Sequence, residues 1–173
     1  MILKVFKVDP QAKIPNYETL SAACFDLSAL IPQNSSVSIF TNRGDKYEVQ
    51  ANHDGSNGKS YINLFPHERA LIRTGLIFDI PQGHSIRLHP RSGMALKYGL
   101  VLANSEGIID EDYVHETKII MINTSSESVK IYDGDRIAQG EVVKYEQAEI
   151  EETHIQPEQK TNRIGGFGST GKN

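Results

Sequence analysis

The segment 104–116, NSEGIIDEDYVHE, holds the residues of this chain that are best suited to chemistry. Two isoleucines run directly into Asp110, and Tyr113 follows three residues later. A carboxylate held at the end of an apolar strand, beside a bound water, can act as a general base. The amide of Asn104 both donates and accepts hydrogen bonds, which suits a base edge or a peptide. For this segment alone, an ordinary hairpin with a polar turn is an equally good interpretation.

The elements that must position these residues are short and extended. Runs rich in β-branched and apolar residues, separated by Gly, Pro, Asn and Asp, are typical of strands joined by turns. One short helix is expected over Met94–Tyr98, capped by Ser92 and ended by Gly99. The pattern predicts an all-β barrel or sandwich. Strands are expected over residues 2–8, 37–40, 69–74, 75–80, 84–89, 117–123, 128–132 and 136–145.

Composition limits the classes of function. The chain has 173 residues, a formal net charge of −4 and one cysteine, Cys24. One domain with a real core is therefore expected, without a basic field for direct nucleic-acid binding. A single cysteine excludes an internal disulfide and fits a reducing compartment. No signal peptide or apolar span is evident, so we expect a soluble protein without a membrane partner, in the cytoplasm (the host cytoplasm if viral).

Residues 41–63 differ from the rest in composition. Gly, Asn and Asp are dense here, as in NHDGSNG at 52–58, and such residues favour turns. The pattern predicts a protruding hairpin, with 46–51 running out and 59–64 running back. The Arg-Gly-Asp triplet at 43–45 is interpreted as a turn rather than an adhesion signal.

The C-terminal segment is polar and then rich in glycine. Residues 149–163 carry many charges and few apolar groups, which predicts a mobile tail. The glycines at 165–171 would let backbone N–H groups converge on a phosphate. Gly166 to Lys172 matches G-x-x-x-x-G-K, but a P-loop needs Ser or Thr next, a strand before and a helix after. Asn173 follows instead, so that motif is rejected.

Five stretches stand together in the chain: AACFDL at 22–27, PRSGMA at 90–95, GIIDEDY at 107–113, GDRIAQ at 134–139 and RIGGFGSTG at 163–171. In this order and spacing they resemble the motifs of the trimeric dUTP pyrophosphatases (dUTPases). The resemblance implies a dUTPase-like β-barrel of the jelly-roll type over residues 1–148, with the insert at about 41–63 and a flexible arm at 149–173. It implies Mg²⁺-dependent hydrolysis of dUTP to dUMP and pyrophosphate by a homotrimer whose sites are shared between chains. That reaction limits uracil incorporation into DNA and supplies dUMP for thymidylate synthesis.

The resemblance also implies a role for each matching residue. Asp110 would orient and activate the attacking water, and Tyr113 would lie under the deoxyribose and leave no room for a 2′-hydroxyl. Asn104 would read the uracil edge together with the backbone of Ile108, Ile109 and Lys118. Asp26 would reach the magnesium through water, and Arg136 would support the phosphate site. The phosphates would be held by Arg91, Ser92, Gly93 and Gln139, and from the arm by Arg163, Gly168 and Ser169, with Phe167 covering the uracil.

The sequence departs from the family pattern in three places. Cys24 and His115 stand where family members usually have glycine, and the spacing from Arg163 to Phe167 is one residue shorter than usual. Cys24 is expected to be a buried apolar residue, whereas His115 adds bulk to the hairpin that carries Tyr113. Two alternatives remain: the related dCTP deaminases, which share the fold, and a binding module whose insert at 41–63 contacts a regulatory protein.

Overall fold

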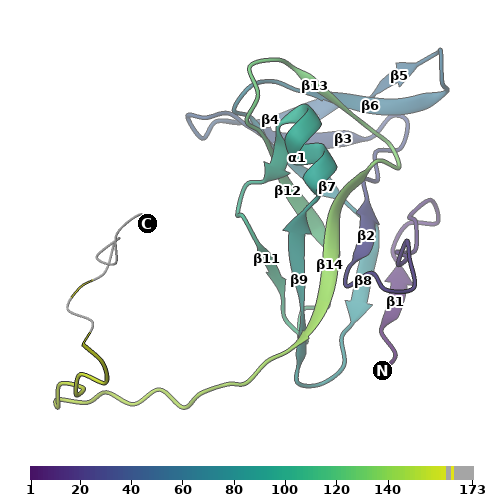
Figure 1. Cartoon of the computed structure of the whole chain (residues 1–173). Coiled ribbons are helices and arrows are strands. Elements are labelled where there is room, and N and C mark those ends of the chain that lie inside the picture. Colours follow the sequence, from purple (N-terminus) through teal and green to yellow (C-terminus); the bar gives the residue numbers. More distant parts are fainter. Residues whose placement is uncertain (163–164, 166–173) are drawn as a thin grey trace.

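Buried and exposed side chains alternate along the longer strands, and this alternation sets the fold. In β6 (Lys59–Leu64) and β7 (Arg69–Arg73) every second residue is buried, as expected for strands with one face on a core. The computed structural model describes residues 1–162 and 165, and these form an all-β body with one short helix (Figure 1). This confirms the predicted fold class.

The remaining elements follow in chain order. They are β1 (Lys4–Lys7), β2 (Phe25–Ser28), β3 (Ser36–Phe40), β4 (Lys46–Gln50), β5 (Asn52–Asp54), β8 (Leu76–Asp79), β9 (His84–Pro90), α1 (Ser92–Tyr98), β10 (Leu100–Leu102), β11 (Gly107–Ile109), β12 (Lys118–Asn123), β13 (Val129–Tyr132) and β14 (Arg136–Lys144).

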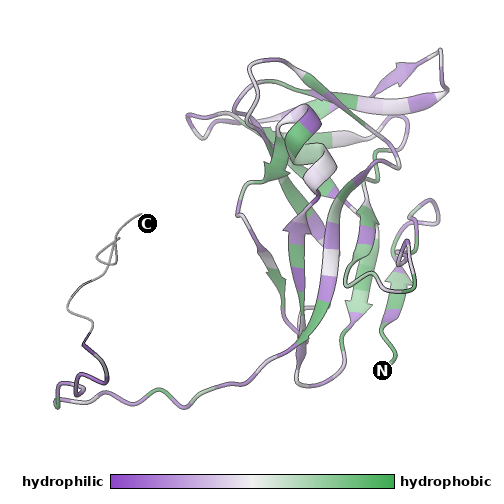
Figure 2. Cartoon of the chain, in the orientation of Figure 1, coloured by the Kyte–Doolittle hydropathy of each residue, from purple (hydrophilic) through white to green (hydrophobic). Residues whose placement is uncertain are grey.

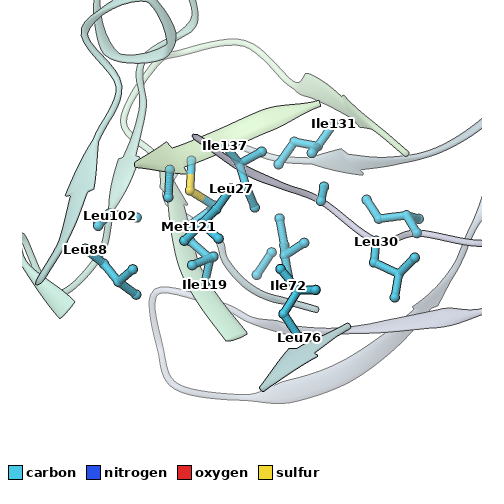
Figure 3. Packing of buried hydrophobic residues seen from close by; sticks show 14 of the residues in the cluster. Leu27, Leu30, Ile72, Leu76, Leu88, Leu102, Ile119, Met121, Ile131 and Ile137 are labelled. Carbon is cyan, nitrogen blue, oxygen red and sulfur yellow. The ribbon is translucent and has the colours of Figure 1, made fainter. Parts of the chain in front are cut away.

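The strands pair antiparallel in two larger and two smaller sheets. One larger sheet has the order β10-β12-β7-β3-β4, and the other has the order β11-β9-β14-β2. The smaller sheets are β13-β6-β5 and β1-β8. The sheets enclose one cluster of buried aliphatic side chains, in which Leu27 and Ile137 from one sheet pack with Ile72 and Met121 from another (Figure 3). Burying each such side chain contributes roughly 1.5–3 kcal/mol.

The predicted hairpin at 46–64 is wrong in its pairing. β4 pairs with β3, with Val37 opposite Val49, whereas β6 pairs with β13 and with the short β5. Ile62 and Leu64 of β6 are fully buried, so this half of the segment belongs to the core. Alternation of apolar residues along 60–64 gives β6 a core face, and burying it against β13 outweighs local hairpin pairing. The turn at 55–58, between β5 and β6, is exposed throughout, as are residues 42–48 around the start of β4.

The helix begins two residues earlier than the sequence predicts. Ser92 is its first residue rather than its cap, and Arg91 occupies the cap position without a side-chain capping bond. Arg91 is held in an extended conformation, and its guanidinium is engaged by other partners described below. The predicted end at Gly99 is confirmed, because this glycine has a φ of 66° and its N–H bonds to the Ala95 carbonyl.

Beyond β14 the chain leaves the body. Residues 146–162 are exposed and carry no strand or helix, and they run away from the sheets (Figure 1). Hydrophilic residues dominate this segment, whereas apolar ones are concentrated in the body (Figure 2). Within the described part of the chain, no helix is long and apolar enough to cross a membrane.

Candidate active site

The segment 104–116 lines a cleft and is not a simple turn. The strands on either side of it, β10 and β12, pair with each other, but β11 within the segment does not pair with β12, because β11 belongs to the β9 sheet and β12 to the β7 sheet. β11 is an edge strand whose free edge lies along a cleft of about 230 Å³. Backbone polar groups at such an edge are available to a ligand. The cleft is lined by Leu88, Leu102, Asn104, Gly107, Ile108, Ile109, Asp110, Tyr113, Thr117, Lys118, Ile119 and Ile120.

Local turns place the polar residues at the rim of this cleft. Ser105 has a φ of 62°, and this left-handed residue reverses the chain just after Asn104. At the other end Asp110 is exposed, and its carbonyl accepts a bond from the Tyr113 N–H at 3.1 Å. The neighbouring Glu111 carboxylate accepts a bond from the Gly83 N–H. The cleft therefore combines an apolar floor, an unpaired strand edge and an exposed carboxylate.

A second group of polar residues, the arginine cluster, is formed by Arg91 and Arg136 around Asp26, where β2, β14 and the end of β9 lie side by side. The carboxylate of Asp26 is only 12% exposed, and both of its oxygens are engaged by arginines. Arg91 Nε lies 2.9 Å from one oxygen, and Arg136 Nη1 lies 3.0 Å from the other. Arg136 Nη1 also lies 2.8 Å from Glu18, and Arg91 donates to the Arg136 carbonyl at 3.0 Å. The bond to Glu18, followed by the charge of Asp26, raises the pKa of Arg136 above its usual value.

Strand register brings the remaining polar residues to the same place. Gln139 on β14 lies opposite Asp26 on β2 and opposite His89 on β9. Its side-chain amide donates to the Pro90 carbonyl at 2.9 Å. Ser92 and Gly93 begin α1 beside this cluster, and both are exposed. A Cβ at Gly93 would meet no atom of this chain within 4 Å, so packing within the chain does not require a glycine there.

The structure thus gathers the candidate residues into two groups with no member in common. Asn104, Ile108, Ile109, Asp110, Tyr113 and Lys118 line the cleft, whereas Asp26, Arg91, Ser92, Gly93, Arg136 and Gln139 lie at the arginine cluster. Arg163, Phe167, Gly168 and Ser169 lie outside the described residues. The sequence reasoning missed Glu18, which lies in a loop without a periodic pattern, and it gave no role to Glu116.

The two unusual residues of the motifs also have defined surroundings. The ring of His115 is exposed and meets the Tyr113 ring edge-on, with centroids 5.6 Å apart. Cys24 is half-buried rather than buried, so the expectation that it packs as an apolar residue is only partly met. Burial, and then the charges of Glu141 and Asp26, raise the pKa of its thiol.

Comparison with known proteins identifies the family. The family model described as dUTPase matches residues 56–171. The chain is 37% identical to the deoxyuridine 5′-triphosphate nucleotidohydrolase of Nautilia profundicola, over 99% of this chain and 100% of that protein.

The chain belongs to the dUTPase family.

Solved dUTPase structures share its fold at low sequence identity. A variant of the Staphylococcus bacteriophage 80alpha dUTPase with dUpNHpp superposes with a TM-score of 0.72 at 21% identity, covering 98% of each chain. A variant dUTPase from phage phi11 of S. aureus, described as revealing the coordination of a structural Mg(II) ion, gives a TM-score of 0.68 at 19% identity, covering 91% of this chain and 100% of that one. The dUTPase fold predicted from the five motifs is therefore confirmed.

Proposed function

We propose that the protein hydrolyses dUTP to dUMP and pyrophosphate, and that the cleft beside β11 holds the deoxyuridine. The observation that carries this proposal is the free edge of β11, which shares one narrow cleft with Asp110 and Tyr113. Backbone donors and acceptors at a fixed strand edge can pair with uracil, and they mismatch cytosine because an amine replaces a carbonyl. Asn104 at the rim adds an amide, and Tyr113 lies against the sugar.

Asp110 acts as the general base in this proposal. Its exposed carboxylate accepts a proton from water as the water oxygen bonds to the α-phosphorus. The bond from that phosphorus to the bridging oxygen breaks, and the electron pair leaves with pyrophosphate. Arg91, Ser92, Gly93 and Gln139 hold the phosphates, and positively charged or N–H donors of this kind stabilise the charge on the leaving group.

The residues at the arginine cluster fit a magnesium ion held indirectly. Both oxygens of Asp26 are engaged by Arg91 and Arg136, so this carboxylate is suited to contact a metal-bound water rather than the metal. Mg²⁺ in nucleotide sites usually keeps several waters and takes its other ligands from the phosphates. When bound there, Mg²⁺ would neutralise phosphate charge, while Asp26 would orient its hydration shell.

We infer further that the active form is a homotrimer with sites shared between chains. The cleft and the arginine cluster share no residue, which fits a site completed by a second copy. Ile108 and Ile120, which line the cleft, are 56% and 39% exposed, and Val114 beside Tyr113 is 67% exposed. Exposed apolar side chains of this kind form a surface that a partner subunit covers. The arm at 149–173 would close over the nucleotide and bring Arg163 and Phe167 to it.

A regulatory protein that contacts 41–63 would meet the turn at 55–58 and the exposed residues of β4 and β5, because alternate residues of β6 face the core.

The proposed cellular location is the cytoplasm. A single cysteine fits its reducing conditions.

Release of pyrophosphate from dUTP and from each of the four standard deoxynucleoside triphosphates, with Mg²⁺ present, tests the proposed reaction. We expect dUTP to be hydrolysed in clear preference to the others. Incubation with dCTP and measurement of ammonia tests the deaminase alternative. Ammonia release from dCTP without pyrophosphate release from dUTP would contradict the proposal.

A further inference from the structure

The turn that carries Asp110 and Tyr113 is fixed to the body through Glu116. The Glu116 side chain is only 16% exposed, and its two carboxylate oxygens lie 3.0 and 3.1 Å from Arg73 Nε. One of these oxygens also accepts a bond from the Gly75 N–H at 2.9 Å. Hydrogen bonds to an ionised carboxylate are about twice as strong as neutral ones, so this contact is a firm anchor.

The surface that receives Glu116 is itself rigid. Gly75 has a φ of 71°, and a Cβ there would lie 2.6 Å from Leu30 and 2.7 Å from Ala12. The chain is therefore confined to glycine at this position, and the N–H that points to Glu116 is set by close packing. Next to it, the Thr74 hydroxyl donates to the Thr117 carbonyl at 2.6 Å, and the Thr117 N–H donates to the Leu76 carbonyl at 2.8 Å.

Glu116 in turn holds Tyr113. The Tyr113 hydroxyl donates to the main-chain carbonyl of Glu116 at 3.2 Å, and Tyr113, which lines the cleft, is 41% exposed. The Tyr113 ring also meets the ring of His115 edge-on. The His115 side chain is itself exposed. The position of the Tyr113 ring thus depends on where the backbone of Glu116 is held.

We propose that Glu116 is a positioning residue that fixes Tyr113 and thereby sets discrimination between deoxyribose and ribose. This inference rests on the proposed function, in which Tyr113 leaves no room for a 2′-hydroxyl. Tyr113 can exclude a 2′-hydroxyl only if its ring is held firmly enough not to be pushed aside. The anchor of Glu116 to Arg73 and Gly75 supplies that resistance, although Glu116 itself touches no substrate.

The test is Glu116→Gln, with kcat/KM measured for dUTP and for UTP. Glutamine keeps the shape but loses the charge, and its NH₂ group replaces one of the two oxygens that accept from Arg73, so the turn is loosened. We expect the ratio of kcat/KM for dUTP over UTP to fall about tenfold, mainly because hydrolysis of UTP rises. The KM for UTP should fall more than the KM for dUTP changes.

Glu68→Gln is the matched control. Its carboxylate also accepts a backbone N–H, from Phe65 at 3.0 Å, and a tyrosine hydroxyl, from Tyr47 at 2.6 Å, but it does not line the cleft. The same loss of charge there should lower the melting temperature without changing the dUTP-to-UTP ratio. If both variants shift the ratio equally, or neither does, Glu116 does not position Tyr113.

A second variant keeps the inference testable if Glu116→Gln does not fold. Arg73→Lys keeps the charge but loses the fixed Nε–H donor that lies near both carboxylate oxygens. Its dUTP-to-UTP ratio should also fall, and an unchanged ratio would overturn the inference. If the wild-type protein releases no pyrophosphate from dUTP, the proposed function is contradicted. If the wild-type protein prefers dUTP but the variants keep the same dUTP-to-UTP ratio, only the role of Glu116 is contradicted.

Discussion

Asp26 and Asp110 are carboxylates of the same chain in opposite surroundings. Asp26 is nearly enclosed, and two guanidinium groups occupy its oxygens. Asp110 is exposed at the rim of a cleft, with no charged partner among its described contacts. Guanidinium donors occupy both oxygens of Asp26, so they compete with any water for this carboxylate. Of the two, only Asp110 presents an open carboxylate to a water in the cleft.

Asp110→Asn tests this division directly. Asparagine is nearly isosteric, but it does not accept a proton from water near neutral pH. Hydrolysis of dUTP should fall by about 10²–10⁴-fold, the usual contribution of a general base. Affinity for a non-hydrolysable dUTP analogue with Mg²⁺ should change far less, because other residues hold the base and the phosphates. Steady-state kinetics and calorimetric titration measure the two effects.

Asp112→Asn is the control for that substitution. Asp112 lies on the same turn and is exposed, but it does not line the cleft. The Asp112→Asn variant should hydrolyse dUTP at nearly the wild-type rate, because it loses the same charge but keeps Asp110 as the base. Equal rates for wild type and the Asp110 variant would show that Asp110 is not the base.

At the residue scale, the sequence identifies the motif residues better than their partners. Resemblance places Asp26, Arg91 and Arg136 in one site, and the structure shows all three in contact. Glu18 is a different case, since its ion pair with Arg136 joins a loop to a strand more than a hundred residues away. A surface glutamate in an irregular loop carries no signal of such a contact, which depends on the complete fold.

At the element scale, the separation of β11 from β12 creates the cleft. Consecutive strands often pair with each other, and that local rule is why the sequence alone fits a plain hairpin equally well. Here β11 pairs with β9 and β12 pairs with β7, because the apolar side chains of each strand face the core from different sheets. Strand periodicity predicts that each strand exists, but the partner of each strand is decided by long-range packing.

The segment 41–63 provides a test at the same scale. Replacing Gly55–Gly58 by the two-residue turn Asn-Gly should leave dUTP hydrolysis nearly unchanged, because these residues are exposed and a short turn can close β5 onto β6. Deleting all of 41–63 should instead prevent folding, since it removes most of β6, including the fully buried Ile62. Activity assays and thermal melting of both variants distinguish the turn from the strand. A folded, active protein lacking all of 41–63 would contradict the assignment of β6 to the core.

Ile62→Ala measures the contribution of β6 to the core. Ile62 is fully buried, so the substitution should lower the free energy of unfolding by about 2–5 kcal/mol. Ile150→Ala is the matched control, because Ile150 is 96% exposed beyond β14 and should have almost no effect. Urea denaturation measures both values, and similar values for the two variants would be inconsistent with a core strand.

The arm is the other element whose role can be tested. Removing residues 161–173 should leave the melting temperature of the body nearly unchanged, because the described residues before it are exposed and form no strand or helix. Turnover of dUTP should fall strongly, since Arg163 and Phe167 are lost from the closed site. A truncated protein with full turnover would show that the arm does not act as a lid.

At the scale of the whole molecule, the question is whether one chain can build a complete site. β9 is a single strand, yet Leu88 lines the cleft while Pro90 and Arg91 lead into the arginine cluster. Three residues of strand span roughly 10 Å, and the two groups share no residue. Closed rotational symmetry lets the cluster of one copy meet the cleft of the next, and each copy then contributes to two sites.

Mixing two inactive variants decides between a shared site and a site within one chain. Asp110→Asn disables the cleft, and Arg91→Ala disables the arginine cluster, so each variant alone should be nearly inactive. If the two groups come from neighbouring chains, every mixed trimer contains one site with both groups intact, because somewhere around the ring an unmodified cleft meets an unmodified cluster.

Co-refolding the two variants in equal amounts should therefore restore activity. Random assembly into trimers makes about three quarters of them mixed, and one intact site in each restores about a quarter of the wild-type activity. Light scattering should give the mass of three chains for the same preparation. Mixing the folded proteins without refolding is the control, because chains that do not exchange cannot form mixed trimers. If the cleft and the cluster of one chain formed the site together, both variants would stay inactive in every mixture, and the shared-site arrangement would be excluded.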